Sequence, residues 1–324
     1  MKAAVLRLYF PLLHKFSVVF TGIYLALFHV DVSLKKALPY LVLALFTAAG
    51  IAAFGYLLND YFDRDADQCS GKVNLYNEQP LLFWIGIVAA LVIGLSPWIW
   101  LPFNQVSGIG LVIEMFLFAA YAVPPLRLKE RGWAGIVCDS CYAYVIPCLL
   151  AGYTFILLKP DAQVHWSAVA ALSTWLLLLG MRNILQHQLA DEIDDRQSKT
   201  LTLVTVSGSS LAQQYLDILR MLEWCSFALV LWLSYPKIWL LMAWLLYGVI
   251  YSGKKIIVNA APWKYAMWRK QFTDQHWLNE FYEKYWAIIA LLLFSVLHPA
   301  YLAILAFHLV VFFPLYKPDL LQRF

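Results

Sequence analysis

The chain has 324 residues, of which 62% are hydrophobic and 14% charged, and its formal net charge is +4. Together with a mean hydropathy of +0.66, this composition is typical of a polytopic helical membrane protein and excludes an ordinary soluble domain. The predicted fold class is therefore all-α, with the lipid bilayer as its surroundings. The modest positive charge gives no reason to expect nucleic acid as a partner.

Apolar segments, many of them close to the ~20 residues that cross a bilayer, recur along the whole chain. We interpret residues 1–324 as one transmembrane domain of nine to ten helices. The last two pairs of segments are short, and only Tyr235-Pro236 or His298-Pro299 separates their members, so each pair predicts either a hairpin or one kinked helix. Residues 253–284 predict an interfacial connector. The apolar segments lie at 10–30, 38–58, 81–101, 106–124, 133–157, 165–186, 220–235, 237–252, 285–297 and 299–313.

Two acidic clusters each follow a long apolar segment. The first occupies residues 59–67 with the sequence NDYFDRDAD, and the second occupies residues 191–196 with the sequence DEIDDR. Concentrated negative charge at a membrane surface is costly unless cations offset it. Residues four apart share one face of a helix, and carboxylate oxygens are ligands that Mg²⁺ prefers. The clusters therefore predict a site for Mg²⁺ and a polyanion, with these metal-binding residues: Asn59, Asp60, Asp63, Asp67, Asp191 and Asp195.

The distribution of lysine and arginine predicts the orientation in the membrane. Most basic residues lie in the loops on the side of the two acidic clusters, whereas the opposite loops hold only Lys35, Lys36, Lys159 and Lys237. The positive-inside rule then places both clusters in the cytoplasm. We expect a multi-pass protein of a bacterial inner membrane.

Three ordered motifs resemble those of the UbiA superfamily of intramembrane prenyltransferases. Residues 59–67 match the first signature, NDxxDxxxD, and Asp191 with Asp195 matches the second. Residues 121–129, with the sequence YAVPPLRLK, resemble the tyrosine–proline–lysine loop of that family. The resemblance extends from residue 1 to about residue 252. It implies transmembrane helices around a central cavity, dependence on Mg²⁺ as cofactor, and a prenyl diphosphate donor.

The same resemblance assigns roles to particular residues. Ionisation of an allylic diphosphate requires neutralisation of the leaving group, and positioned cations provide it. The residues assigned to catalysis are Asp63, Asp67, Asp191, Asp195 and Lys129. Those assigned to substrate binding are Asn59, Lys72, Arg127, Arg196 and Lys199, and to these we add Asn183 and His187 from the polar residues before the second cluster, which are not part of the family pattern. Aromatic walls would shield an allylic cation from water and stabilise it.

Two departures from the family pattern bear on the substrate. The family has an arginine-containing turn before its third helix, and residues 74–80 of this chain, NLYNEQP, lack that arginine. Asn183 and His187 continue the four-residue spacing of Asp191 and Asp195 into a membrane segment, where polar groups are expensive. We expect this polar stripe to line the cavity. His187 can be a general base, a group near the metal, an acceptor contact or a structural histidine.

Three functions are compatible with these patterns. The leading hypothesis is transfer of an isoprenyl group to an aromatic or other small or lipid acceptor. The second keeps the fold but changes the reaction to phosphoribosyl transfer onto a polyprenyl phosphate or to terpene cyclisation. The third is a metal-binding or lipid-binding membrane protein without turnover, which a replaced carboxylate in either signature would favour, and none is replaced.

Overall fold

The computed structural model describes residues 2–71, 74–234, 237–260 and 278–316, and all secondary structure among them is helical. This confirms the predicted all-α class. The long helices are α1 (Lys2–Val30), α2 (Leu34–Ser70), α4 (Pro80–Leu95), α5 (Gln105–Ala122), α7 (Ile146–Ile156), α8 (Trp166–Ala190), α11 (Ser209–Leu233), α12 (Lys237–Ala260), α15 (Trp286–Leu297) and α16 (Tyr301–Val311). The shorter helices and helical turns are α3 (Leu75–Glu78), η1 (Ser96–Ile99), η2 (Leu128–Glu130), α6 (Trp133–Ser140), η3 (Cys141–Val145), α9 (Glu192–Gln197), α10 (Leu203–Ser207), η4 (Phe281–Tyr285) and α17 (Phe313–Tyr316).

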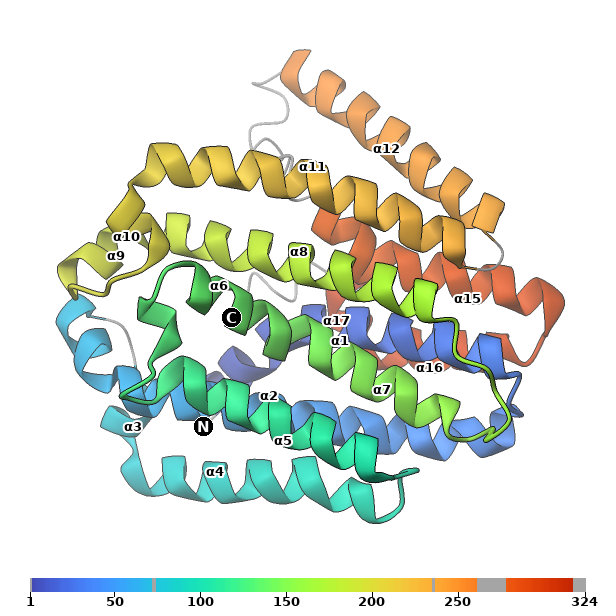
Figure 1. Ribbon diagram of the computed structural model, residues 1–324, viewed down its shortest axis with the longest axis horizontal. Helices are drawn as coiled ribbons and strands as arrows, with labels where there is room; N and C mark the ends of the chain where they lie inside the picture. The colour runs from blue at the N-terminus through green and yellow to red at the C-terminus, as the bar shows by residue number, and fades with distance from the viewer. Residues whose placement is uncertain (1, 72–73, 235–236, 261–277, 317–324) are drawn as a thin grey trace.

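The long helices run side by side along the long axis of the molecule (Figure 1). Helix α2 packs against α4 and α5, α8 packs against α11, and α1 packs against α7. The short helices α3, α9 and α10 gather at one end, at the left of Figure 1. Because α2 and α8 also end there, the two acidic clusters lie at the same end of the bundle.

Within the described part of the chain, six helical segments are long and apolar enough to cross a membrane. Side chains on their outer faces are large and apolar, such as Val88, Val92 and Val112. In water an apolar surface of this kind would be unfavourable, whereas in a bilayer the lipid tails are its solvent. The fold is therefore that of an integral membrane protein. The six segments are Leu12–Val30, Leu34–Ser70, Pro80–Ile99, Gln105–Ala122, Trp133–Ile156 and Trp166–Ala190.

Each of the last two pairs of apolar segments forms two separate helices, α11 with α12 and α15 with α16. Helices α11 and α12 contact each other, and α16 follows α15 after His298 and packs against it. The His298-Pro299 step is thus a turn and not a kink within one helix. Helix α16 has 11 residues, and at about 1.5 Å per residue it covers about half of a ~30 Å hydrocarbon layer. Of the predicted connector at 253–284, residues 261–277 lie outside the described residues.

Close helix packing fixes the two helices that carry the acidic clusters. A Cβ atom added at Gly50 in α2 would lie 2.1 Å from the backbone nitrogen of Gly94 in α4. One added at Gly180 in α8 would lie 2.7 Å from the Cα of Ser140 in α6. Because real Cβ atoms do not approach backbone this closely, glycine allows these helices to contact each other directly. The positions of α2 and α8 therefore depend on backbone-to-backbone contacts.

Candidate active site

The first acidic cluster lies within α2, which continues past the apolar segment to Ser70. Asn59, Asp63 and Asp67 follow one another at intervals of one helical turn, and all three line the same two cavities. Asp60 lines only the larger cavity. The helix ends at Gly71, whose φ of 72° is in the left-handed region that favours glycine. The cluster is therefore a rigid helical face and not a loop.

The second acidic cluster lies at the junction of α8 and α9. Asp191 ends α8 with φ of −92° and ψ of 4°, yet the helical hydrogen bonds continue through it. Its backbone N–H donates to the His187 oxygen at 2.9 Å, and the Asp195 N–H donates to the Asp191 oxygen at 2.9 Å. Asp191 and Asp195 thus keep the predicted one-turn spacing, and both line the smaller cavity together with Asp194.

The two clusters face one small cavity of about 230 Å³. Hydroxyl groups of Ser198, Thr200 and Thr202 also line it. A larger cavity of about 560 Å³ adjoins it and extends between α1, α2, α5 and α7. The residues that line both cavities are Asn59, Asp63, Asp67, Tyr121, Ile184 and His187. A molecule with a polyanionic head and an apolar tail could therefore occupy both spaces at once.

Two basic residues contact the acidic face of α2. The Lys129 ammonium makes an ion pair with Asp63 and lies 3.3 Å from the Oδ1 of Asn59. Arg127, at a left-handed φ of 37°, donates to the Oδ1 of Asp63 at 3.2 Å and to Glu130 at 2.5 Å. Burial lowers the pKa of Lys129, and the neighbouring Asp63 carboxylate acts in the opposite direction. The site thus holds positive charge beside its carboxylates, as binding of a polyanion requires.

Two other predicted cations, Arg196 and Lys199, are not brought to the cavities. Arg196 donates to Glu192 at 2.9 Å, one turn earlier in α9, and it is half exposed. Lys199 is exposed and adopts a left-handed φ of 58°. Neither residue lines either cavity. Lys72 lies outside the described residues.

The polar stripe of α8 divides between the two cavities. His187 lines both, with a side chain 69% exposed and its Nδ1 3.5 Å from the Oδ2 of Asp191. Asn183 lines the larger cavity and donates to the Tyr144 hydroxyl at 2.9 Å. Its Oδ1 accepts from Arg182 at 2.9 Å, and Arg182 makes a fully buried ion pair with Glu223. The buried ion pair between Arg182 and Glu223 therefore holds Asn183 of the polar stripe in place.

Asn74 is a residue of the site that the sequence patterns did not identify. It is 2% exposed, and its Nδ2 donates to the Oδ2 of Asp67 and to the Asp60 backbone oxygen, each at 2.7 Å. Its Oδ1 accepts from the Tyr76 backbone N–H at 3.0 Å and so caps α3. Asn74 therefore orients Asp67. The sequence feature that could have identified Asn74 is its position as the first residue of segment 74–80, which departs from the family pattern.

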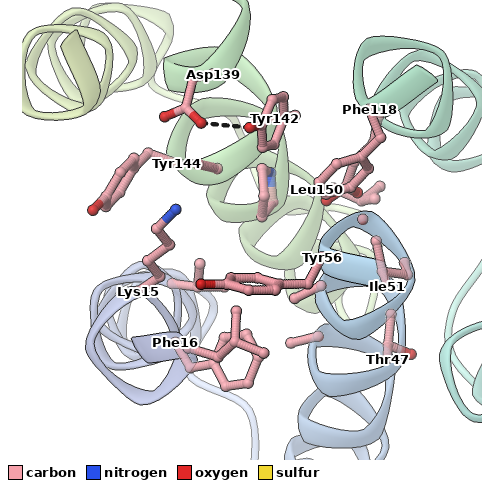
Figure 2. Close-up of a pocket in the computed structure, with 18 of the residues that line it drawn as sticks. Lys15, Phe16, Thr47, Ile51, Tyr56, Phe118, Asp139, Tyr142, Tyr144 and Leu150 are labelled. Atoms are coloured by element: carbon pink, nitrogen blue, oxygen red, sulfur yellow. Dashed lines mark hydrogen bonds between the residues drawn. The ribbon is translucent and has the colours of Figure 1, made fainter. Parts of the chain in front are cut away.

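The larger cavity has mostly apolar and aromatic walls. Phe16 of α1, Tyr56 of α2, Phe118 of α5 and Tyr142 of η3 surround it (Figure 2). Rings of Phe118 and Tyr142 lie 4.4 Å apart between centroids, and those of Tyr121 and Tyr142 lie 5.3 Å apart. Such walls exclude water and present ring faces to a cationic centre. Three ionisable groups from membrane helices also reach it: Lys15, Glu114 and Asp139.

The donor chemistry of the smaller cavity fits Mg²⁺. No three His, Cys, Asp or Glu side chains in the described part of the chain are grouped closely enough to hold a metal ion by themselves. Mg²⁺, however, is commonly bound by one or two carboxylates, with water and substrate phosphates as the remaining ligands. Asp63 and Asp67 on one wall with Asp191 and Asp195 on another provide such pairs.

Solved structures with a similar fold exist, although no protein-family model and no curated protein matches this chain. A UbiA homologue from Archaeoglobus fulgidus bound to GPP and Mg²⁺ has a TM-score of 0.57 at 20% identity, covering 93% of this chain and 99% of that one. The same homologue bound to DMAPP and Mg²⁺ gives 0.57 at 20% identity over 93% and 98%. Bound to Cd²⁺ it gives 0.54 at 18% identity over 93% and 98%. The chain therefore has the UbiA fold, and the resemblance inferred from its motifs is confirmed at the level of the fold.

Proposed function

We propose that this protein is a Mg²⁺-dependent intramembrane prenyltransferase. It transfers an isoprenyl group from a prenyl diphosphate to a small aromatic or lipid acceptor. The observation that carries this proposal is the junction of the two cavities: an acidic, Mg²⁺-compatible cavity adjoins an aromatic-lined one, and Asp63 and Asp67 line both. The similar structures contain GPP or DMAPP together with Mg²⁺, which supports the same donor class.

In the proposed reaction the carbon–oxygen bond between the allylic carbon and the diphosphate breaks, and the electron pair leaves with the diphosphate. The acceptor supplies the electron pair of the new bond and loses a proton. Mg²⁺ would neutralise charge on the diphosphate. The residues that would hold Mg²⁺ are Asp63, Asp67, Asp191 and Asp195. Lys129 lines the smaller cavity and would bind a phosphate oxygen as that charge develops, whereas Arg127 donates to Asp63 without lining the cavity.

The larger cavity would hold the prenyl chain. Its walls of Phe118, Tyr121 and Tyr142 keep water away from the allylic carbon, and their ring faces stabilise its positive charge. Without such exclusion, water would capture the carbon and hydrolysis would replace transfer.

The active site is expected to open to the cytoplasm. Both acidic clusters lie at one end of the bundle, with α3, α9 and α10 (Figure 1). The excess of lysine and arginine in the loops at that end supports this orientation. A soluble diphosphate donor or product would then exchange directly with the compartment in which such molecules are made.

The test is diphosphate release by the purified protein in lipid nanodiscs, supplied with Mg²⁺ and either GPP or DMAPP. Release is expected with Mg²⁺, none with EDTA, and none from the Asp63→Ala/Asp191→Ala double variant. Phosphoribosyl diphosphate with a polyprenyl phosphate is tested in parallel. Turnover of that pair alone, or formation of cyclic hydrocarbon from the prenyl donor without an acceptor, would replace the proposal by one of the alternative reactions. Absence of Mg²⁺-dependent donor binding would contradict all of them.

A further inference from the structure

Glu114 places a carboxyl group in the wall of the larger cavity, within the membrane-spanning helix α5. The residue is 4% exposed. Within the described part of the chain it makes no hydrogen bond and no ion pair. A carboxyl group inside a membrane segment is unfavourable without a partner, and such residues commonly mark a functional site.

Two more polar groups of this cavity also lack a hydrogen-bond partner among the described residues. Thr47 of α2 is 8% exposed, and its Oγ1 is unpaired. The indole Nε1 of Trp98, in η1, is likewise buried and unpaired. Both residues line the larger cavity, and neither lines the smaller one. A buried polar group without a partner is costly, so three of them along one cavity require a physical explanation.

Helix α2 shows how far these groups lie from the acidic clusters. Its side chains line the larger cavity at successive turns from Asn59, at the junction of the two cavities, through Ile51 to Thr47. Figure 2 shows Ile51 and Thr47 on neighbouring turns of this helix. At 1.5 Å per residue, Ile51 lies about 12 Å and Thr47 about 18 Å from Asn59 along the helix axis.

Contacts between helices place Glu114 and Trp98 at the same levels. A Cβ atom added at Gly55 of α2 would lie 2.2 Å from the Phe118 ring of α5. Glu114 is one turn further from the acidic clusters than Phe118, which puts it near the level of Ile51. Trp98 belongs to η1, which contacts α2 at the far end of the cavity. The unpaired polar groups therefore begin about 12 Å from the junction.

We propose that these unpaired polar groups limit the length of the prenyl chain, so that the donor carries a short chain of about two isoprenyl units. The inference rests on the proposed prenyl transfer and specifies its donor. Three bonds of an extended backbone span about 3.5 Å, so the four bonds of one isoprenyl unit span roughly 4.7 Å. A geranyl chain therefore ends before Glu114, whereas a geranylgeranyl chain reaches Thr47 and Trp98.

The physical basis of the limit is hydrogen bonding. A hydrocarbon tail neither donates nor accepts, so a tail that covers the carboxyl, hydroxyl and indole groups would shut them off from water and leave them unpaired. In a purely apolar channel each added isoprenyl unit would instead tighten binding, because it buries more apolar surface. Chain length should therefore affect donor binding in the opposite direction from that expected of an apolar channel.

The experiment compares Mg²⁺-dependent binding of geranyl, farnesyl and geranylgeranyl diphosphate to the purified protein in lipid nanodiscs. Each donor competes with labelled GPP, so no acceptor is needed. Geranylgeranyl diphosphate should compete at least about tenfold more weakly than GPP in the wild type, as one unpaired buried group would require. Partition of a long donor into the lipid is the same for every variant, so ratios between donors are compared across variants.

Glu114→Met replaces the carboxyl group by an apolar group of similar length. We expect it to bring geranylgeranyl diphosphate within about threefold of GPP or to reverse the preference. Thr47→Val, which removes the unpaired hydroxyl, should shift the preference in the same direction by a smaller factor. Glu114→Gln keeps a polar group and should retain the wild-type preference. Thr174→Val is the control and should retain it too, because Thr174 is exposed on α8 and lines neither cavity.

Two results would overturn the inference. One is binding of geranylgeranyl diphosphate to the wild type as tightly as GPP. The other is an undiminished preference for GPP in both Glu114→Met and Thr47→Val, and Thr47→Val alone decides if the unfolding transition of Glu114→Met shows that it does not fold. In both cases Mg²⁺-dependent binding of GPP leaves the proposed function standing. If no prenyl diphosphate binds in the presence of Mg²⁺, the proposed function itself fails, and the inference with it.

Discussion

Replacing Asp63 with asparagine removes the negative charge that Lys129 and Arg127 share, with almost no change in side-chain size. Asp63 is 16% exposed and Lys129 is 9% exposed, so the ammonium would be left largely buried without its counter-ion. Removing one partner of such a pair costs about 2–3 kcal/mol, below the value for a fully buried pair, because Asn59 still accepts from Lys129. At roughly 2–4 °C per kcal/mol, the melting temperature of Asp63→Asn should fall by at least about 4 °C.

Turnover should fall further than stability does. Asp63 is proposed to hold Mg²⁺ on the diphosphate, and its loss should reduce kcat by at least about 100-fold, which is on the order of 3 kcal/mol in the barrier. A second change separates the two effects. Lys129→Met removes the orphaned charge, so the Asp63→Asn/Lys129→Met double variant should regain most of the melting temperature while its turnover stays lost.

Differential scanning fluorimetry in detergent gives the melting temperatures, and diphosphate release with GPP and saturating Mg²⁺ gives kcat. Asp191→Asn serves as the matched comparison, because its carboxylate lines the opposite wall and is 30% exposed. It should lose turnover to a similar degree with a smaller change in melting temperature. Near-normal turnover of Asp63→Asn, or recovered turnover in the double variant, would refute the assignment of Asp63 to the metal and diphosphate.

Three further predictions concern packing, the polar stripe and topology. Gly180→Ala should destabilise the protein by about 1–3 kcal/mol, because the added methyl group would overpack against Ser140. Gly253→Ala is the control and should not destabilise the protein, since nothing lies within 4 Å of the added Cβ. Equal melting temperatures of the two variants would contradict the close contact between α6 and α8. His187→Ala should raise the acceptor KM several-fold with little change in melting temperature, because the His187 side chain is exposed at the cavity. A lowered melting temperature with an unchanged acceptor KM would instead indicate a structural role. Cysteines at Gln197 and Glu130 should be labelled from the cytoplasmic side and one at Gln163 from the other side; labelling of the first two from opposite sides would exclude a shared site.

Much of this protein could be predicted from local features of the sequence. Spans followed from long apolar runs, because each backbone polar group in a bilayer must be satisfied within its own helix. The acidic faces followed from four-residue spacing, since Asn59, Asp63 and Asp67 lie on one continuous helix. Even the spacing of Asp191 and Asp195 persists across the junction of two helices. Features of this kind depend only on neighbours within one or two turns.

Other features depend on contacts between distant segments. Arg196 belongs to the second motif, but it does not line either cavity. Its guanidinium instead forms a local ion pair with Glu192. Asn74 became part of the site only through the way in which α3 folds back on the end of α2.

Lys15 and Asp139 show most clearly what only the tertiary structure decided. Each is an isolated charge in an apolar segment, with no motif around it. A single charge in a membrane helix shows from the sequence that its burial is unfavourable, but not which group it faces. The direction of its side chain depends on how that helix is rotated against the others. Packing of α1 against α7, and of α6 against α8, directs both charges into one cavity. The sequence by itself determined the helices and the acidic face of α2, whereas the long-range packing determined which charges face the same cavity.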